Sequence, residues 1–345
     1  MHRLLKRGAC LITGLTSVGR RPNWLSAATP TADIYFLNAM ASFISRSGGL
    51  QAVGPNVYRC NDRFVVLRYA NDAELSILES ARRQAVFYVI DDDIEALAVA
   101  PELPAGYRRR LAGFAATSLP RILRISDVIV APNELLLERF QDHATALLEP
   151  SYCAVCDDFS HFDDRHRLRI VFTGTRSHLD DVEAIAPALV GLCDASPQVE
   201  LTTFLGRSAP AALRQHRNII HREPLGWVAY RELLASARFH LALAPFRPVP
   251  TNECRSHNKI HDHAAFGAAG LYGDIHPYRR TVSHGRNGLL LAMRAELWLE
   301  SLSALIANPA LARQLAERGA QLSRTIGSPA KLRAFWCEAL ALPTT

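Results

Sequence analysis

The chain has 345 residues, 49% of them hydrophobic and 21% charged, a composition typical of folded globular proteins at a length that favours two domains of roughly 100 to 200 residues each. The formal net charge of +6 is spread evenly over the two halves, which argues against a nucleic-acid-binding protein. No window holds the roughly 18 uninterrupted apolar residues of a membrane-spanning helix, which argues against a transmembrane protein.

Cysteine usage and the first residues bear on where the protein works. The seven cysteines are odd in number and scattered along the chain, which is long enough to fold without disulfides, so a reducing compartment is favoured. The chain opens with basic residues and an apolar run, as a signal peptide does, but the run is short and leads directly into a strand-like segment. We therefore expect a cytoplasmic protein, and the net charge leaves contact with an anionic membrane surface open.

The first part of the chain alternates short apolar runs with helical spacers, which is typical of an α/β domain with a parallel sheet. The expected strands are residues 8–14, Ile34–Leu37, Phe64–Leu67, Ala85–Ile90 and Val128–Val130. The expected helices between them are Leu75–Arg83 and Tyr107–Arg124. Trp24 lies in a loop and could stack on a sugar or serve as a half-buried anchor. Sites in such a domain lie at the carboxyl ends of the strands.

Three acidic residues, Asp91, Asp92 and Asp93, follow directly after the expected strand Ala85–Ile90. At a strand end they could bind a divalent cation, or one of them could act as a base toward an acceptor hydroxyl. Alternatively they cap a helix, because acidic residues are favoured in a first helical turn. Asp92 is our candidate base, and we expect no metal.

Residues 151–168 lose periodicity and gain charge, which indicates a linker between two domains. This linker contains Cys153 and Cys156, followed by His161 and His166, and all four side chain types can bind zinc. The distance between the second cysteine and the first histidine is too short for a zinc finger, and no second Cys-x-x-Cys follows. A fortuitous cluster is therefore the favoured interpretation.

The second part of the chain again alternates strands and helices. The expected strands are Leu168–Phe172, Val199–Leu205, Ile219–Ile220, Arg238–Pro245 and Gly270–Gly273, and the expected helices are Val182–Cys193, Trp227–Ala237, Glu296–Ala307, Pro309–Arg324 and Ser328–Leu342. Gly174 and Thr175 follow the first of these strands, where a glycine lets the backbone approach a phosphate. One such glycine is weak evidence by itself.

The most informative stretch runs from Thr251 to Leu291. A polar, basic loop opens a helix, and a helix N-terminus attracts anions through its free N–H groups and its dipole. Arg255, Ser256 and Lys259 add two cations and a hydroxyl at that place, and a helix starting near Ser256 would carry both cations on one side. Because the chain has only three lysines, Lys259 does not come from a lysine-rich surface. We interpret this stretch as a diphosphate cradle.

This stretch resembles the C-terminal nucleotide-sugar half-site of GT-B glycosyltransferases, especially the group resembling family 4. The family pattern is filled here by Asn252, Arg255, Ser256, Lys259, Asp262, Gly267, Tyr278, His284, Gly285, Asn287 and Gly288. The resemblance covers about residues 169 to 325. Two positions depart from it, because relatives usually have glutamate where this chain has Asp262 and proline where it has Ala269.

The resemblance implies that Asp262 grips the donor ribose while Arg255, Ser256 and Lys259 face the phosphates. Arg255 and Lys259 would then replace a metal in catalysis. It also places Gly174, Thr175 and Tyr278 in the set that binds the donor. The implied donor is a nucleotide diphosphate sugar, and no cofactor is expected.

Histidines in the same stretch allow a rival interpretation. His257 and His261 are four residues apart, as metal-binding helical histidines are, and His263 is close by. A metallohydrolase could be built from them together with Asp262. No glutamate follows the first histidine in the pattern of a zinc protease, and a metal cation would be repelled by Arg255 and Lys259.

The sequence therefore predicts an α/β protein of the GT-B arrangement, with two Rossmann-like, doubly wound domains facing across a cleft. Residues 1–150 form an abbreviated acceptor-side domain, 151–168 a linker, 169–327 the nucleotide-sugar-binding domain, and 328–345 a helix that crosses back to the first domain. The implied function is sugar transfer to a glycan, a lipid-linked acceptor or a small molecule, in polysaccharide or glycoconjugate synthesis. A non-catalytic nucleotide- or glycan-binding protein of the same fold is the alternative.

Overall fold

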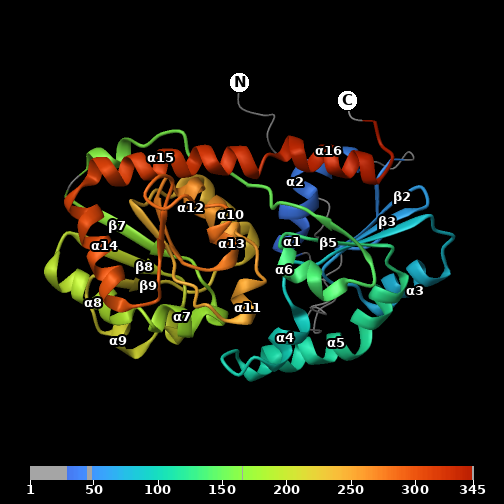
Figure 1. Ribbon diagram of the computed structural model, residues 1–345, viewed down its shortest axis with the longest axis horizontal. Coiled ribbons are helices and arrows are strands. Elements are labelled where there is room, and N and C mark those ends of the chain that lie inside the picture. Colours follow the sequence, from blue (N-terminus) through green and yellow to red (C-terminus); the bar gives the residue numbers. More distant parts are fainter. Residues whose placement is uncertain (1–28, 45–48, 165, 344–345) are drawn as a thin grey trace, which may run out of the picture.

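The computed structural model describes residues 29–44, 49–164 and 166–343. They fold into two α/β domains, each built on a six-stranded sheet (Figure 1). The expected strand at residues 8–14 and Trp24 lie outside the described residues. Of the described helices, none is both long and apolar enough to cross a bilayer.

The first sheet joins a parallel half to an antiparallel edge. Its strands, in spatial order, are β1 (Gln51–Ala52), β2 (Val57–Cys60), β3 (Arg63–Leu67), β4 (Ala85–Val89), β5 (Val128–Ala131) and β6 (Ala144–Leu147). Strands β3 to β6 are parallel, whereas β1, β2 and β3 form an antiparallel meander. The expected strands at β3, β4 and β5 are confirmed.

The prediction of a strand at Ile34–Leu37 is wrong, because this segment is helical. Its apolar run belongs to one continuous helical segment made of α1 (Pro30–Ala32), η2 (Asp33–Leu37), α2 (Asn38–Met40) and η3 (Ala41–Phe43). Tyr35 and Phe36 are fully buried between the sheet and a second helix. A helix buried on more than one side needs apolar residues around most of its circumference, which gives the same short run as a buried strand.

Helices cover both faces of the first sheet. One face carries α3 (Asp72–Ser80), α4 (Ile94–Val99), α5 (Ala105–Ile125), α6 (Glu134–Leu137) and η4 (Glu138–Phe140). The other face carries the segment from α1 to η3 and the last helix of the chain, α16 (Pro329–Ala339). The last helix therefore lies on the first domain, and Figure 1 shows it beside α2.

The second sheet is parallel throughout. In spatial order its strands are β12 (Leu289–Leu291), β11 (Ala269–Gly273), β10 (Leu241–Ala244), β7 (Leu168–Phe172), β8 (Val199–Thr203) and β9 (Ile219–His221). The chain runs from β7 outward to β9, then returns to β10 on the other side of β7. Strands β7 and β10 therefore flank a topological switch point, where α/β sheets place their ligands.

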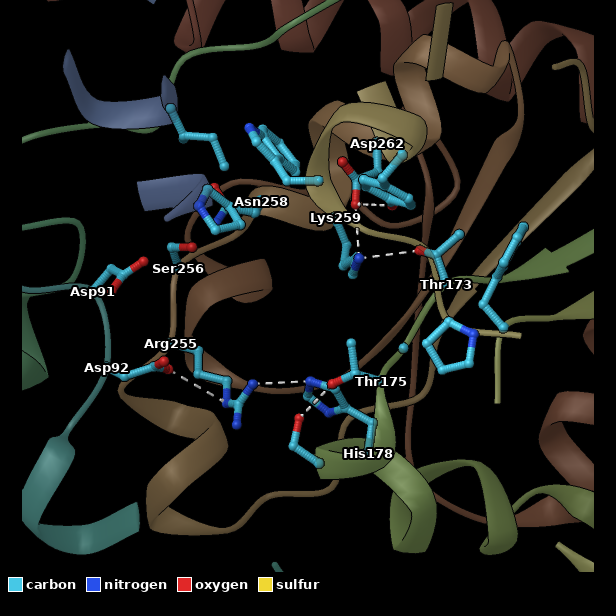
Figure 2. A pocket seen from close by; sticks show the side chains of 18 of the residues that line it. Asp91, Asp92, Thr173, Thr175, His178, Arg255, Ser256, Asn258, Lys259 and Asp262 are labelled. Atoms are coloured by element: carbon cyan, nitrogen blue, oxygen red, sulfur yellow. Dashed lines mark hydrogen bonds and ion pairs between the residues drawn. The ribbon is translucent and has the colours of Figure 1, made fainter. Parts of the chain in front are cut away.

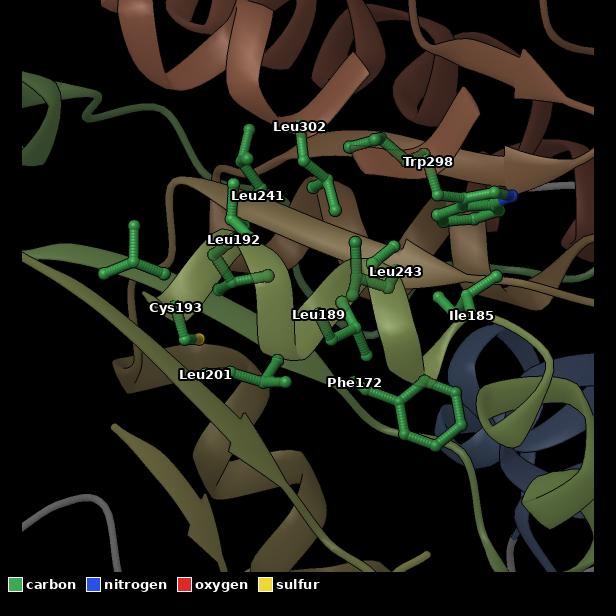
Figure 3. Close-up of a cluster of buried hydrophobic side chains, with 14 of the residues drawn as sticks. Phe172, Ile185, Leu189, Leu192, Cys193, Leu201, Leu241, Leu243, Trp298 and Leu302 are labelled. Atoms are coloured by element: carbon green, nitrogen blue, oxygen red, sulfur yellow. The ribbon is translucent and has the colours of Figure 1, made fainter. Parts of the chain in front are cut away.

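The helices of the second domain pack on both faces of this sheet. They are η5 (Ser160–Asp163), η6 (Arg176–His178), α7 (Leu179–Glu183), α8 (Ala186–Ala195), η7 (Gly206–Ser208), α9 (Ala211–Arg214), α10 (Trp227–Ser236), α11 (Pro250–Glu253), α12 (Asn258–Phe266), α13 (His276–Arg279), α14 (Ala295–Ala307) and α15 (Pro309–Ile326). The larger core lies under α8 and α14, where Leu189, Leu302 and Trp298 meet the sheet residues Phe172 and Leu243 (Figure 3). Cores on both faces confirm the Rossmann-like arrangement.

Candidate functional site

A cavity of about 400 Å³ lies where the two domains meet, within the range of small-molecule sites. The second domain contributes the loops that follow β7 and β10 together with the start of α12, and the first domain contributes α1, η2 and the end of β4. Of the residues predicted for the site, those that line this cavity are Asp92, Gly174, Thr175, Arg255, Ser256, Lys259 and Asp262. Figure 2 shows the labelled side chains of this set, all of them except Gly174, around the same space.

Lys259 is held at the cavity wall by groups from two elements. Its Nζ donates to Thr173 Oγ1 at 3.0 Å and to Asp262 Oδ2 at 2.7 Å. Tyr230 donates its hydroxyl to the same carboxylate oxygen at 2.7 Å, and the ammonium lies 5.6 Å from the centre of the Tyr230 ring. The charge of Lys259 is therefore fixed in place before any ligand arrives.

Arg255 occupies the opposite side of the cavity from Lys259 (Figure 2). Its Nη1 lies 2.9 Å from His178 Nε2, and its Nε lies 3.8 Å from Asp92 Oδ1 of the first domain. The expectation that one helix carries both cations is wrong, because α12 begins only at Asn258. Arg255 precedes the helix in a loop, so the two cations reach the cavity from different directions.

His178 is a site residue that the sequence interpretation missed. Its Nδ1 lies 2.8 Å from Asp181 Oδ2, and its ring stacks on Phe246 with centroids 4.1 Å apart. Because the Arg255 guanidinium can only donate, Nε2 accepts and Nδ1–H donates to Asp181. Burial, followed by the charge of Arg255, lowers the pKa of His178 to about 4, so the ring is neutral near pH 7. A histidine three residues before an aspartate, just after a strand, is the signal that could have found it.

The two neighbours of His178 should shift its titration in opposite directions. Arg255→Gln removes a positive charge 2.9 Å away and should raise the pKa of His178 above about 4. Asp181→Asn removes the carboxylate that favours the charged ring and should lower it further. NMR titration of the His178 ring protons measures both changes. Shifts of the same sign in the two variants would contradict the arrangement of charges described above.

Asp181 ties this histidine to the loop that follows β10. Its Oδ1 accepts from the backbone N of Arg247 at 3.1 Å and from Asn252 Nδ2 at 3.1 Å. Asp181 and Asn252 are both buried. Asn252, which the family pattern includes, therefore has a supporting part here, because it orients the carboxylate that orients His178.

The three acidic residues that follow β4 have two different roles. Asp93 caps α4, since its Oδ1 accepts from Ala96 N at 3.0 Å. Asp91 and Asp92 line the cavity and are bridged by Arg68, at distances of 2.5 Å and 2.6 Å. Burial opposes ionisation of Asp92, but Arg68 and Arg255 outweigh it and hold its pKa below the usual range. Arg68, which the sequence interpretation also missed, takes the position next to these carboxylates that a metal would need.

The turn after β7 brings backbone close to the cavity. A Cβ at Gly174 would lie 2.2 Å from the Phe172 ring, so any larger residue would have to displace that buried ring. Thr175 Oγ1 and Ser177 Oγ are 2.9 Å apart and both residues line the cavity. Ser256, 9% exposed, lies between Arg255 and the start of α12. These hydroxyl-bearing residues line the same cavity as Arg255 and Lys259.

Tyr278 does not belong to the cavity lining. It is fully buried in an aromatic cluster, with its ring centre 4.8 Å from that of Tyr272 and 5.9 Å from that of Phe246. Its hydroxyl also lies in the interior. A direct donor contact through Tyr278 is not supported, and the residue acts instead by packing behind Phe246, on which His178 stacks.

The candidate metal ligands do not converge. His257 Nε2 lies 3.0 Å from Glu149 Oε2, His261 Nδ1 lies 2.8 Å from Ser323 Oγ, and His263 stacks on Tyr272. Burial first, then the charge of His257, lowers the pKa of His261 to about 3. Within the described residues no three histidine, cysteine or acidic side chains are grouped as a metal site.

The linker cysteines and histidines have structural contacts of their own. Cys156 donates to Asp158 O at 3.0 Å and packs against Gly267, while His161 Nε2 lies 3.0 Å from Phe239 O. Cys153 and Cys156 are both free thiols. The favoured interpretation of a fortuitous cluster is consistent with these separate partners.

No family model and no curated protein sequence matches the chain, but its structure is similar to solved glycosyltransferases. HepE from Anabaena in complex with UDP-glucose superposes with a TM-score of 0.55 at 13% identity over 78% of this chain and 75% of that one. Sucrose-phosphate synthase from Thermosynechococcus elongatus superposes with a TM-score of 0.53 at 12% identity, over 77% of this chain and 69% of that one. The pneumococcal O-GlcNAc transferase GtfA with UDP and GlcNAc superposes with a TM-score of 0.53 at 10% identity, over 85% of this chain and 64% of that one. With two such domains meeting at a cavity at their strand ends, this chain has the GT-B fold of glycosyltransferases.

Proposed function

We propose that this protein is a glycosyltransferase that moves a sugar from a nucleotide diphosphate sugar to an acceptor hydroxyl without a metal ion. The observation that carries the proposal is the convergence of Arg255, Lys259 and the Gly174 turn on one cavity at the switch point of the second sheet. HepE was solved with UDP and glucose, and GtfA with UDP and GlcNAc. These complexes support a nucleotide-sugar donor and a sugar-containing acceptor for the same fold.

The chemical requirement of the reaction is a stable leaving group. Negative charge grows on the diphosphate as the bond between the sugar C1 and the phosphate oxygen breaks. Arg255 and Lys259 supply two cations at fixed positions, and the N-terminus of α12 adds free N–H groups. The helix begins at Asn258, one residue before Lys259, and both residues line the cavity. Asp262, Ser256 and Thr175 are the proposed contacts to the ribose and the phosphates.

Asp92 is the proposed acceptor-side base. It stands on the first domain, with its Oδ1 3.8 Å from Arg255 Nε, and it is ionised near pH 7 because of the arginines beside it. The acceptor O–H would give its proton to Asp92 while the oxygen forms the new bond to C1. The products are the glycosylated acceptor, the nucleoside diphosphate and the proton on Asp92. The acceptor would be a glycan, a lipid-linked sugar or a small molecule of a polysaccharide or glycoconjugate pathway.

A donor panel tests this function directly. The protein is incubated with UDP-glucose, UDP-N-acetylglucosamine, GDP-mannose and further nucleotide sugars, and the release of nucleoside diphosphate is measured with and without EDTA. We expect release from at least one donor at an unchanged rate in EDTA. Loss of release on chelation would contradict the metal-free mechanism. UDP binding by calorimetry without release from any donor, in the presence of an acceptor panel, would indicate a binding protein instead.

A further inference from the structure

Arg68 has an unusual backbone conformation at the end of β3. Its φ is +64°, in the left-handed region that non-glycine residues rarely adopt because Cβ meets the backbone there. Its N donates to Val89 O at 2.8 Å, and its carbonyl accepts from the Tyr88 hydroxyl at 3.0 Å. Two contacts to β4 therefore hold Arg68 in a costly conformation, and such conformations gather at functional sites.

The conformation directs the guanidinium at two carboxylates of the neighbouring strand end. Nη1 donates to Asp91 Oδ1 at 2.5 Å, and Nη2 donates to Asp92 Oδ2 at 2.6 Å. The side chain is only 11% exposed and lies 5.2 Å from the centre of the Tyr69 ring. Thr31 donates to the second oxygen of Asp91 at 2.8 Å. Asp91 is thus bonded through both oxygens, whereas Asp92 turns its Oδ1 toward the cavity and Arg255 (Figure 2).

We propose that Arg68 is a positioning residue for the transfer reaction, which fixes the orientation of Asp92 so that Oδ1 is presented to the acceptor hydroxyl. The contacts give the two carboxylates different roles. Asp91 binds the guanidinium of Arg68 and holds it in place. Asp92 binds the same guanidinium through Oδ2, and its Oδ1 faces the cavity. Arg68 itself does not line the cavity, so its effect on an acceptor passes through Asp92.

The charges around Asp92 make Arg68 the dominant partner. The titratable and charged groups that face this region are Arg68, Tyr69, Asp91 and Tyr107 of the first domain and His178 and Arg255 of the second. His178 is neutral, and Arg255 lies farther away, at 3.8 Å. Arg255 also faces the proposed diphosphate site, where a bound diphosphate would compete for its charge. Arg68 would then be the cation that still holds Asp92.

An experiment that does not depend on turnover tests this inference. The side-chain carboxyl carbons of ¹³C-labelled aspartate are titrated by NMR in the wild type and in Arg68→Gln, with Asp91→Asn and Asp92→Asn used for assignment. We expect the pKa of Asp92 to rise by about one unit or more when the cation is removed. Arg68→Lys should give an intermediate rise, because one ammonium cannot bond both carboxylates in the same way. An unchanged titration of Asp92 in a folded variant would overturn the inference.

The link to catalysis rests on the proposed function and has its own measurements. With an active donor, turnover of Arg68→Gln should fall about 10-fold to 100-fold, and the acid limb of kcat/KM should move to higher pH along with Asp92. UDP affinity should stay within about twofold, since Arg68 is outside the donor contacts. Arg121→Gln is the matched control, because Arg121 also bridges two carboxylates, Asp72 and Glu79, but at the surface. A fall in turnover with an unmoved acid limb would contradict positioning, whereas an inactive wild type would contradict only the function.

Discussion

Replacing Lys259 with alanine is expected to lower turnover by about 100-fold or more while the protein stays folded. The substitution removes one of the two cations that face the leaving diphosphate. It also leaves the Asp262 carboxylate without its ammonium partner at 2.7 Å. An unpaired carboxylate would then lie close to the leaving diphosphate, whose negative charge grows during the reaction. The measurement is steady-state release of nucleoside diphosphate from the best donor, together with UDP affinity by calorimetry.

Two further variants separate these two effects. Lys259→Ala combined with Asp262→Asn removes that unpaired carboxylate and, compared with Asp262→Asn alone so that the change at the proposed ribose contact cancels, should recover little of the turnover. Lys331→Ala is the matched control, because Lys331 is exposed and donates to Thr325 O, outside the cavity lining. Unchanged turnover in a folded Lys259→Ala protein would remove the central assignment of the site.

The sequence predicted the second half of the site better than the first. The family pattern located Arg255, Ser256, Lys259 and Asp262 at one cavity, because they come from a single stretch whose local order is visible in one dimension. Arg68 lies 23 residues before Asp91, and only the register between β3 and β4 brings the two together. Sequence periodicity does not give that register, so the pairing could not be predicted.

Two features of the first domain show where local patterns mislead. Pro30 could have indicated a helix start before Ile34–Leu37, since proline is favoured in a first helical turn, but the apolar run alone fits strand and helix equally. The hairpin of β2 and β3 turns at Asn61, whose φ is +54°. Asn61 and Asp62 are residue types that favour turns, and their place between two apolar runs could have predicted β2.

A continuous line of charged groups and one neutral histidine links the two walls of the cavity. It runs through Asp181, His178, Arg255, Asp92 and Arg68, with contacts from 2.6 Å to 3.8 Å. Arg255 is the member shared by the two domains. A diphosphate that binds Arg255 would therefore also alter the surroundings of Asp92, so the donor and acceptor halves of the site are electrostatically coupled.

Replacing Trp336 with alanine should lower the free energy of unfolding by about 3 to 5 kcal/mol, the usual cost of truncating a large buried aromatic side chain. Trp336 is fully buried on α16, packs edge-on against Phe36 with centroids 5.1 Å apart, and donates its indole N–H to Tyr35 O at 2.6 Å. The loss would leave a cavity and remove the hydrogen bond from the indole to Tyr35 O. Urea unfolding followed by circular dichroism measures the change.

The neighbouring aromatic residue provides the control for this prediction. Phe335 is only half-buried on the same helix, so Phe335→Ala should lower the free energy of unfolding clearly less than Trp336→Ala. Equal losses would contradict the anchoring role of Trp336.

The loss of Trp336 should also affect the cavity. The helical segment under Trp336 carries Thr31, which bonds Asp91, and Asp33, which accepts from Trp227 Nε1 at 2.7 Å. Trp336→Ala should therefore reduce turnover under conditions in which the protein is still folded. The reason is that the last helix of the chain supports the first-domain wall of the cavity, opposite the wall that carries Arg255 and Lys259.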